Sequence, residues 1–201
     1  MVLTTLAIQA GGESRRMGQN KALMPFLGHP LIERVLERVR PIGDQILLTS
    51  NQPEAFAFFG LPVYPDIFPG QGSLSGLYTA LSAASTPIVA VVACDMPFAS
   101  LALFEYEREL LLTNSSDAVV PQSAEGFEPF HAVYRRETCL RAVRFAIDAG
   151  EKRLISWFSR ANITILTAEQ VRESDPGGLA FSNVNTPEEA LRAEKLAQEH
   201  P

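Results

Sequence analysis

Glycines and basic side chains are concentrated in one short stretch near the start of the chain. The stretch from Ala10 to Lys21 reads AGGESRRMGQNK and holds two arginines and one lysine against a single glutamate. Glycines let backbone N–H groups approach an anion closely, and the basic side chains add positive charge. The pattern predicts a loop that binds phosphate groups; the alternative is a glycine turn with solvated charges.

The spacing in this loop differs from two familiar phosphate-binding motifs. GxGxxG is absent, and a Walker A loop needs a lysine directly after its last glycine, whereas Lys21 lies three residues after Gly18. Lys21 is one of three lysines in the whole sequence, which favours a functional role for it. We therefore expect an anion-binding loop of another kind.

Asp95 is the candidate for binding a metal ion. It follows the run from Pro87 to Cys94, which is apolar enough for a central strand. In open α/β sheets, ligands bind beyond the carboxyl ends of such strands, and a carboxylate there can hold a hard cation. The alternative is that Asp95 caps the next helix, but Ser100 offers a later helix start.

Asn51 and Asp66 are weaker candidates for a binding role. Asn51 follows a strand expected at 45–49, and Asp66 lies in the loop before Gly70. Both residue types are common in turns, where their side chains bond to nearby backbone. From the residues alone, a structural role in a turn is the more frequent explanation for each.

The elements that must position these side chains alternate between strands and helices. Strands are expected at 3–9, 45–49, 87–94, 117–121 and 131–134, and helices at 30 to about 41, 74–84, 101–112, 136–149, 154–160 and 187–198. Alternation of this kind is typical of βαβ units. The sequence predicts an α/β fold with a mainly parallel central sheet and helices on both faces.

Composition narrows the class of protein. The chain has 201 residues, 46% of them hydrophobic, and a net charge of −6, which predicts one globular domain and argues against a general nucleic-acid binder. We expect no signal peptide and no contact with a membrane, because no apolar run is long enough. Cys94 and Cys139 form no disulfide framework, so we expect a reducing, cytoplasmic setting.

Charge is distributed unevenly along the chain. The segment from Arg135 to Arg160 contains seven basic and three acidic residues, a local net charge of +4. Solvated helix faces would explain this segment, and a positive surface that attracts an anion would explain it equally well.

Four sequence motifs resemble those of the molybdenum cofactor guanylyltransferase family. They are the run AGGESRRMGQNKALMPFLGHPLIERVLERV, Asp95–Phe98 (DMPF), Gly126–Arg136 (GFEPFHAVYRR) and Asn183–Pro187 (NVNTP), in the family's order. The sequence departs from the family pattern at two places, both on the side expected to face the nucleotide. Gln9 stands where the family usually has leucine, and residues 70–76 read GQGSLSG in place of GPLAG.

The resemblance implies a Rossmann-like three-layer fold of the nucleotidyltransferase type, in one domain spanning residues 1–201. The N-terminal half would bind the nucleotide and the C-terminal half the acceptor. The implied catalytic residues are Lys21, Arg15 and Asp95, with Asp95 also binding Mg²⁺. The implied GTP-binding residues are Gln9, Ala10, Gly11, Gly12, Lys21, Asn51 and Asp66.

The activity implied by the resemblance is transfer of GMP from GTP to the phosphate of molybdopterin cofactor. The attacking phosphate monoester is already ionised at neutral pH, so no general base is needed. A cytidylyltransferase for the same cofactor, a transferase for another phosphorylated acceptor, and a non-catalytic nucleotide-binding accessory protein are the alternatives. The AGG form of the loop (Ala10–Gly12) favours GTP, since the cytidine enzymes tend to read AAG. We expect a monomer that contacts its client molybdoenzyme, or that enzyme's chaperone, only transiently.

Overall fold

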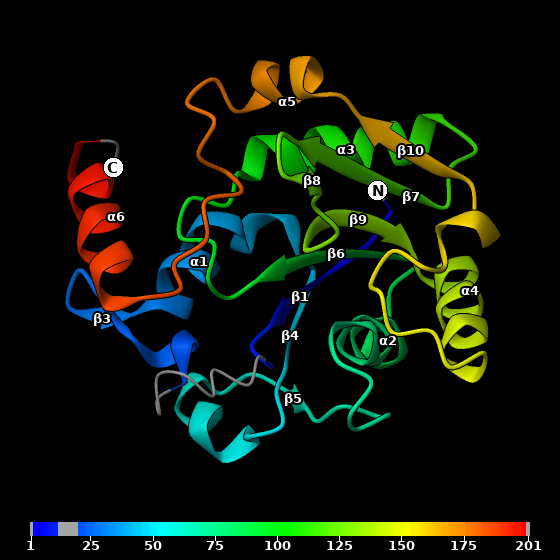
Figure 1. Cartoon of the computed structure of the whole chain (residues 1–201), viewed down its shortest axis with the longest axis horizontal. Coiled ribbons are helices and arrows are strands. Elements are labelled where there is room, and N and C mark those ends of the chain that lie inside the picture. Colours follow the sequence, from blue (N-terminus) through cyan, green and yellow to red (C-terminus); the bar gives the residue numbers. More distant parts are fainter. Residues whose placement is uncertain (1, 12–19, 200–201) are drawn as a thin grey trace.

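A central sheet crosses the molecule, and helices cover both of its faces (Figure 1). The computed structural model describes residues 2–11 and 20–199. The strands of the sheet run in the order β10-β7-β9-β6-β1-β4-β5, and β8 pairs with β7. Their bounds are β1 Thr4–Gln9, β4 Gln45–Thr49, β5 Val63–Tyr64, β6 Ile88–Ala93, β7 Ala118–Ser123, β8 Gly126–Phe127, β9 His131–Arg135 and β10 Ile163–Leu166. A separate small hairpin joins β2 (Pro25–Phe26) to β3 (His29–Pro30).

The sheet is mainly parallel, as predicted. β1 pairs in parallel with β4 and β6, and the pairs β4–β5 and β7–β10 are parallel as well. β9 is the exception, because it runs antiparallel between β6 and β7. The chain reverses direction between β7 and β8, which pair through Ser123 and Gly126, and Gly126 has a φ of 136° that glycine readily adopts.

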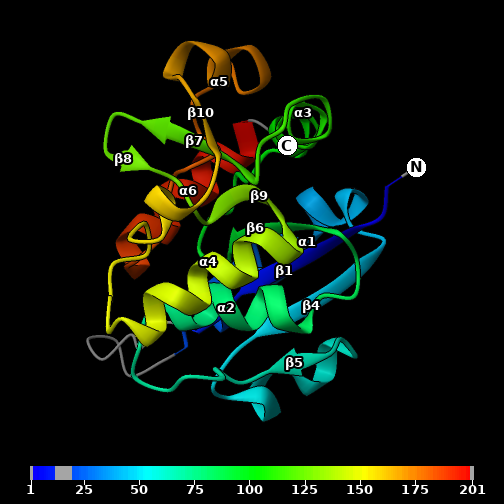
Figure 2. The ribbon, with the colours of Figure 1, turned by 90° about the vertical axis from the view of Figure 1, so that its right-hand side faces the viewer.

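Helices on the two faces bury different sides of the same strands. They are α1 (Leu31–Val39), α2 (Ser73–Ala83), α3 (Leu101–Thr113), α4 (Arg136–Asp148), α5 (Ala168–Ser174) and α6 (Pro187–Glu199). In β1, Leu6 and Ile8 pack with α1 and α3, whereas Ala7 packs with α2 and α4. Figure 2 shows α2 and α4 side by side on their face. This gives the three-layer arrangement that the resemblance implies.

A third apolar cluster, in addition to those on the two faces of the sheet, packs α6 against the small hairpin β2–β3. Ala190, Ala193 and Ala197 of α6 pack with Phe26 of the small hairpin and with Phe98, which follows β6. In the part of the chain that the structure describes, no helix is long and apolar enough to cross a membrane.

One predicted helix is wrong, and several short elements were not predicted. Residues 154–160 form turns and only a short 3-10 segment at Phe158–Arg160. Gly150 ends the preceding helix with a φ of 74°, and Trp157 is fully buried near Tyr134. Burial of this large side chain holds the segment in an irregular path. The short strands β5 and β10 and the helix α5 were missed.

Candidate active site

A cavity of about 650 Å³ opens where β1 and β6 end. Segments from the whole length of the chain line it: Gln9–Gly11, Asn20, Lys21, Gly72, Ser73, Gly76, Ala93–Met96, Phe127–Phe130, Arg153–Ile155, Asn183 and Asn185. All residues of β1 and β6 are buried, so polar groups first become accessible where these strands end. The cavity therefore lies where open α/β sheets bind ligands.

Gln9 is fixed at the end of β1 by hydrogen bonds on both sides. Its backbone oxygen accepts from the Cys94 N–H at 3.0 Å, and its side-chain Nε2 donates to the Gly76 oxygen of α2 at 3.0 Å. A Cβ atom at position 76 would overlap Gln9 Oε1. Glycine at position 76 and glutamine at position 9 therefore fit each other, which gives a physical reason why glutamine is accommodated where the family usually has leucine.

Lys21 and Asp95 come together across the cavity. Lys21 Nζ lies 3.9 Å from Asp95 Oδ2 and donates to Asn185 Oδ1 at 2.5 Å. The Asn20 side chain caps the 3-10 turn Lys21–Leu23, because its Oδ1 accepts from the Ala22 N–H at 3.1 Å. Val184 N–H donates to the Asp95 backbone oxygen at 2.9 Å. The segment that contains Val184 and Asn185 therefore contacts both Asp95 and Lys21.

Asp95 is not the cap of the following helix. That position belongs to Ser100, whose Oγ accepts from the Leu103 N–H at 3.2 Å. Burial raises the pKa of the Asp95 carboxyl, and the nearby Lys21 ammonium lowers it. The carboxylate is left partly exposed to the cavity with one cation beside it, which suits a role toward a charged ligand.

Asn51 and Asp66 bind each other beside the cavity and are not among the residues that line it. Asn51 Nδ2 donates to Asp66 Oδ2 at 2.8 Å, and the Asp66 N–H donates to Asn51 Oδ1 at 2.9 Å. Burial raises the pKa of Asp66, and the hydrogen bond from Asn51 opposes this. Asp66 Oδ1 is within 3.8 Å of where a Cβ of Gly76 would stand, so the pair adjoins the Gln9 side chain.

Two of the predicted site residues, Gly12 and Arg15, lie outside the described residues. Of the others, Gln9, Ala10, Gly11, Lys21 and Asp95 line the same cavity. Within residues 2–11 and 20–199, no group of three or more His, Cys, Asp or Glu side chains could hold a metal ion. A cation bound at Asp95 would take its further ligands from outside these residues, for example from a substrate or from water.

The cavity wall that residue-by-residue reasoning missed comes from the second half of the chain. It consists of Phe127–Phe130 around β8, Arg153–Ile155 after α4, and the amides Asn183 and Asn185. The motifs GFEPFHAVYRR and NVNTP contain most of these residues, so the resemblance held a signal for them. The types of the apolar and amide residues alone gave none, because such residues occur throughout the chain, whereas Arg153 belongs to the basic segment 135–160.

A fully buried histidine follows this wall directly. His131 Nε2 accepts from the Ser100 N–H at 3.1 Å, and its Nδ1 donates to Glu107 Oε1 at 3.1 Å, which requires the neutral ring. The Phe104 ring stacks on the His131 ring, with the two ring centroids 3.9 Å apart. Burial lowers the pKa of His131 to about 3 and raises that of Glu107 well above its ordinary value. Through Ser100, this pair holds the segment that follows Asp95.

Known proteins resemble this chain in sequence and in fold. Residues 6–163 match the MobA-like NTP transferase domain. The "Probable molybdenum cofactor guanylyltransferase" of Carboxydothermus hydrogenoformans is 37% identical over 183 residues, which are 91% of each chain. The molybdenum cofactor guanylyltransferase of Desulfosudis oleivorans is 32% identical over 197 residues, 96% of each chain.

A solved structure shares the fold as well. The molybdopterin-guanine dinucleotide biosynthesis protein A of Archaeoglobus fulgidus superposes with a TM-score of 0.84 at 28% identity, covering 97% of this chain and 99% of its own. The predicted α/β fold of the nucleotidyltransferase type is thereby confirmed. Together with the motifs and the cavity, these matches show that the chain belongs to the family of MobA-like NTP transferase domains.

Proposed function

We propose that this enzyme transfers GMP from GTP to the phosphate of molybdopterin cofactor, giving molybdopterin guanine dinucleotide and pyrophosphate. The observation that carries the proposal is the meeting of Lys21 and Asp95 in the cavity at the ends of β1 and β6. Relatives that cover more than nine tenths of the chain are named for this reaction.

The chemistry asks for neutralisation of charge more than for proton transfer. An oxygen of the acceptor phosphate forms a bond to the α-phosphorus of GTP, and the bond from that phosphorus to the oxygen bridging the α- and β-phosphates breaks. Pyrophosphate leaves with the electron pair. Lys21 supplies a positive charge at the phosphates, and Arg15 is proposed to act beside it. Because the nucleophile is already ionised, the absence of a general base from the predicted site is no obstacle.

Asp95 is the residue proposed to hold Mg²⁺. Mg²⁺ in phosphoryl-transfer sites is commonly bound by one or two carboxylates together with substrate phosphates and waters. A single carboxylate facing the cavity fits that donor set. When bound, the ion would polarise the phosphate oxygens and offset the developing negative charge. Lys21 and Asn185 keep the Asp95 side of the cavity in place.

The base-binding side favours guanine. Gln9 Oε1 and Asp66 Oδ1 both lie within 4 Å of the position that a Cβ on Gly76 would take, so two hydrogen-bond acceptors lie near the same point of α2. The Watson–Crick edge of guanine offers two neighbouring donors, N1–H and the 2-amino group, whereas cytosine offers one donor beside an acceptor. Ala10, Gly11 and Gly12 would then face the ribose and the phosphates.

The remaining parts of the proposal concern the whole chain. We place the nucleotide in the N-terminal half and the acceptor in the C-terminal half of one domain. The enzyme would act in the cytoplasm as a monomer that meets its client molybdoenzyme, or the chaperone of that enzyme, only transiently.

The decisive experiment supplies purified protein with molybdopterin, Mg²⁺ and each nucleoside triphosphate in turn, and identifies the products by mass spectrometry. Formation of the guanine dinucleotide and pyrophosphate from GTP is expected. Preferential formation of a cytosine dinucleotide would establish the cytidylyltransferase alternative. Nucleotide binding, seen as a rise in Tm with GTP, without any transfer would establish the accessory-protein alternative.

A further inference from the structure

The half of the cavity beyond Asp95 combines apolar side chains with two opposite charges. Phe127, Phe130 and Leu154 supply apolar surface, and Glu128 and Arg153 are the charged residues among Phe127–Phe130 and Arg153–Ile155. Within the described part of the chain, no ion pair joins Glu128 to Arg153. A ligand with a flat ring face for apolar contact and with polar groups on its edge matches such a surface.

Glu128 is held in place by its own hairpin. Its Oε1 accepts from Ser123 Oγ at 2.6 Å, and its backbone N–H donates to the Pro121 oxygen at 2.9 Å. Burial and the charge of Glu125 raise the pKa of the Glu128 carboxyl, whereas the bond from Ser123 lowers it. A half-buried carboxylate that is anchored through one oxygen is well prepared to accept hydrogen bonds from a ligand.

Resting on the proposed function, we propose that Glu128 binds the amino-pyrimidinone edge of the pterin ring in the acceptor. That edge carries N3–H and the exocyclic 2-amino group side by side, which makes two donors for one carboxylate. Phe127 and Phe130 supply apolar surface for the flat ring system.

The charge of Glu128 also determines which way round the acceptor binds in the cavity. A phosphate near Glu128 would be repelled, whereas a phosphate near Lys21 is attracted. The pterin edge therefore lies toward β8, and the phosphate lies toward Asp95 and the α-phosphorus of GTP. Glu128 is thus a specificity-determining residue for the acceptor and has no part in binding GTP.

The first test compares Glu128→Gln with wild type in GMP transfer. The amide keeps the size of the side chain but replaces one acceptor by a donor that faces the donors of the pterin. We expect KM for molybdopterin to rise about tenfold or more, with KM for GTP and kcat within about twofold. Glu125→Gln is the matched control, because Glu125 lies in the same hairpin turn, is exposed and does not line the cavity.

The second test asks whether Glu128 reads the 2-amino group itself. Binding of a neutral pterin and of the corresponding lumazine, which has an oxygen in place of that amino group, is measured by fluorescence for both proteins. Wild type should prefer the pterin about tenfold or more, and Glu128→Gln should lose the preference. An equal preference in both proteins would overturn the inference, as would a shift in Mg²⁺ dependence alone. Failure of wild type to transfer GMP would instead refute the proposed function.

Discussion

The charge at Lys21 is expected to contribute to turnover and hardly at all to stability. Its ammonium lies between Asp95 and Asn185, where the phosphates would pass. We predict that Lys21→Ala lowers kcat/KM by about a hundredfold or more, since one electrostatic donor in such a site is worth that much. The exposed Lys195 on α6 provides the control, because Lys195→Ala should leave turnover unchanged. Wild-type turnover in Lys21→Ala would instead support the alternative that the stretch from Ala10 to Lys21 is a glycine turn with solvated charges.

A change at Asp95 separates binding of a metal ion from a structural role. Asp95→Asn keeps the size of the side chain and removes its charge, and Ser100 already caps α3. We predict that Tm shifts by no more than a few degrees while GMP transfer falls by orders of magnitude. Activity and Tm are measured on the same preparations. Nearly full activity, or a large loss of Tm, would contradict the role of Asp95 as a metal ligand.

At the scale of elements, the Glu107–His131 pair joins α3, β9 and the segment after Asp95. Glu107 Oε2 has no hydrogen-bond partner in the described part of the chain, so Glu107→Gln should retain the bond to His131 Nδ1. Burial raises the pKa of Glu107 in the folded protein well above its ordinary 4.5. As pH rises above 4.5, the unfolded chain therefore loses a proton that the folded chain keeps. The free energy of unfolding of wild type falls accordingly.

Removal of that carboxyl should therefore stabilise the protein most at high pH. We predict that the free energy of unfolding of Glu107→Gln relative to wild type grows between pH 5 and pH 8, by up to about 1.4 kcal/mol per pH unit. Urea unfolding at several pH values measures it. In both proteins His131, with a folded pKa of about 3, should still cost stability as pH falls below 6.5. A difference that is constant with pH would show that Glu107 is ionised in the folded protein.

Sequence patterns predicted the long elements well and the short or irregular ones poorly. The apolar runs of β1 and β6 and the helical spacing of α1 leave little choice of structure, because they are long and fully buried on one side or on both. The predicted helix at 154–160 failed because burial of Trp157 depends on the distant Tyr134. Antiparallel β9 could not be foreseen, since strand direction is set by the route of the connecting chain.

The candidate site was predictable in its charged members and less so in its walls. Asp95 stood out because a charged residue at the end of an apolar strand has few structural reasons to be there, and Lys21 stood out because it ends a glycine-rich, basic stretch in a chain with three lysines. Asn51 and Asp66 are still ambiguous by type, and the structure pairs them with each other. The link between Gln9 and Gly76 depends on a tertiary contact across 67 residues, which no local pattern contains.

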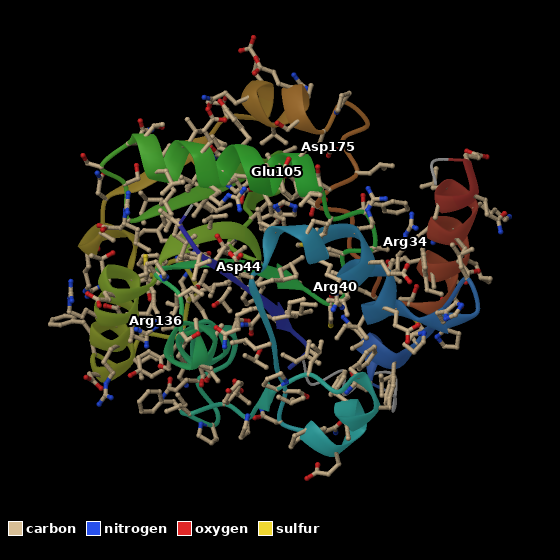
Figure 3. All side chains as sticks on the ribbon, turned by 180° about the vertical axis from the view of Figure 1, so that it is seen from behind. Arg34, Arg40, Asp44, Glu105, Arg136 and Asp175 are labelled. Atoms are coloured by element: carbon tan, nitrogen blue, oxygen red, sulfur yellow. The ribbon has the colours of Figure 1, made fainter. Side chains whose placement is uncertain are left out.

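At the scale of the whole molecule, the basic segment 135–160 is more structural than its charge suggested. Arg135 donates to the Ser116 and Leu111 oxygens, and Arg136, seen between α4 and α2 in Figure 3, donates to the Leu81 oxygen. Arg160 pairs with Glu151. Arg153 differs from these because it lines the cavity. The expected steering of an anionic acceptor therefore depends on the region around Arg153.

Reversal of two charges in that region tests the long-range field. We predict that Lys152→Glu with Arg153→Glu raises the apparent KM for molybdopterin several-fold at low ionic strength, with little change in KM for GTP, and that added salt shrinks the effect. Steady-state kinetics at two salt concentrations check it. Equal losses for both substrates would indicate misfolding or a general field effect, and no change at low salt would mean a solvated surface.

The strap formed by Val184 and Asn185 has a consequence for how the enzyme comes into being. These residues contact Asp95 and Lys21, yet the ribosome synthesises them later than either of those partners. Domains begin to fold from their N-terminal end during translation, so the sheet can assemble while the strap is still missing. A nascent chain therefore has Lys21 and Asp95 before it has the strap that contacts them, and the reaction centre is complete only after residues 184–185 have emerged from the ribosome.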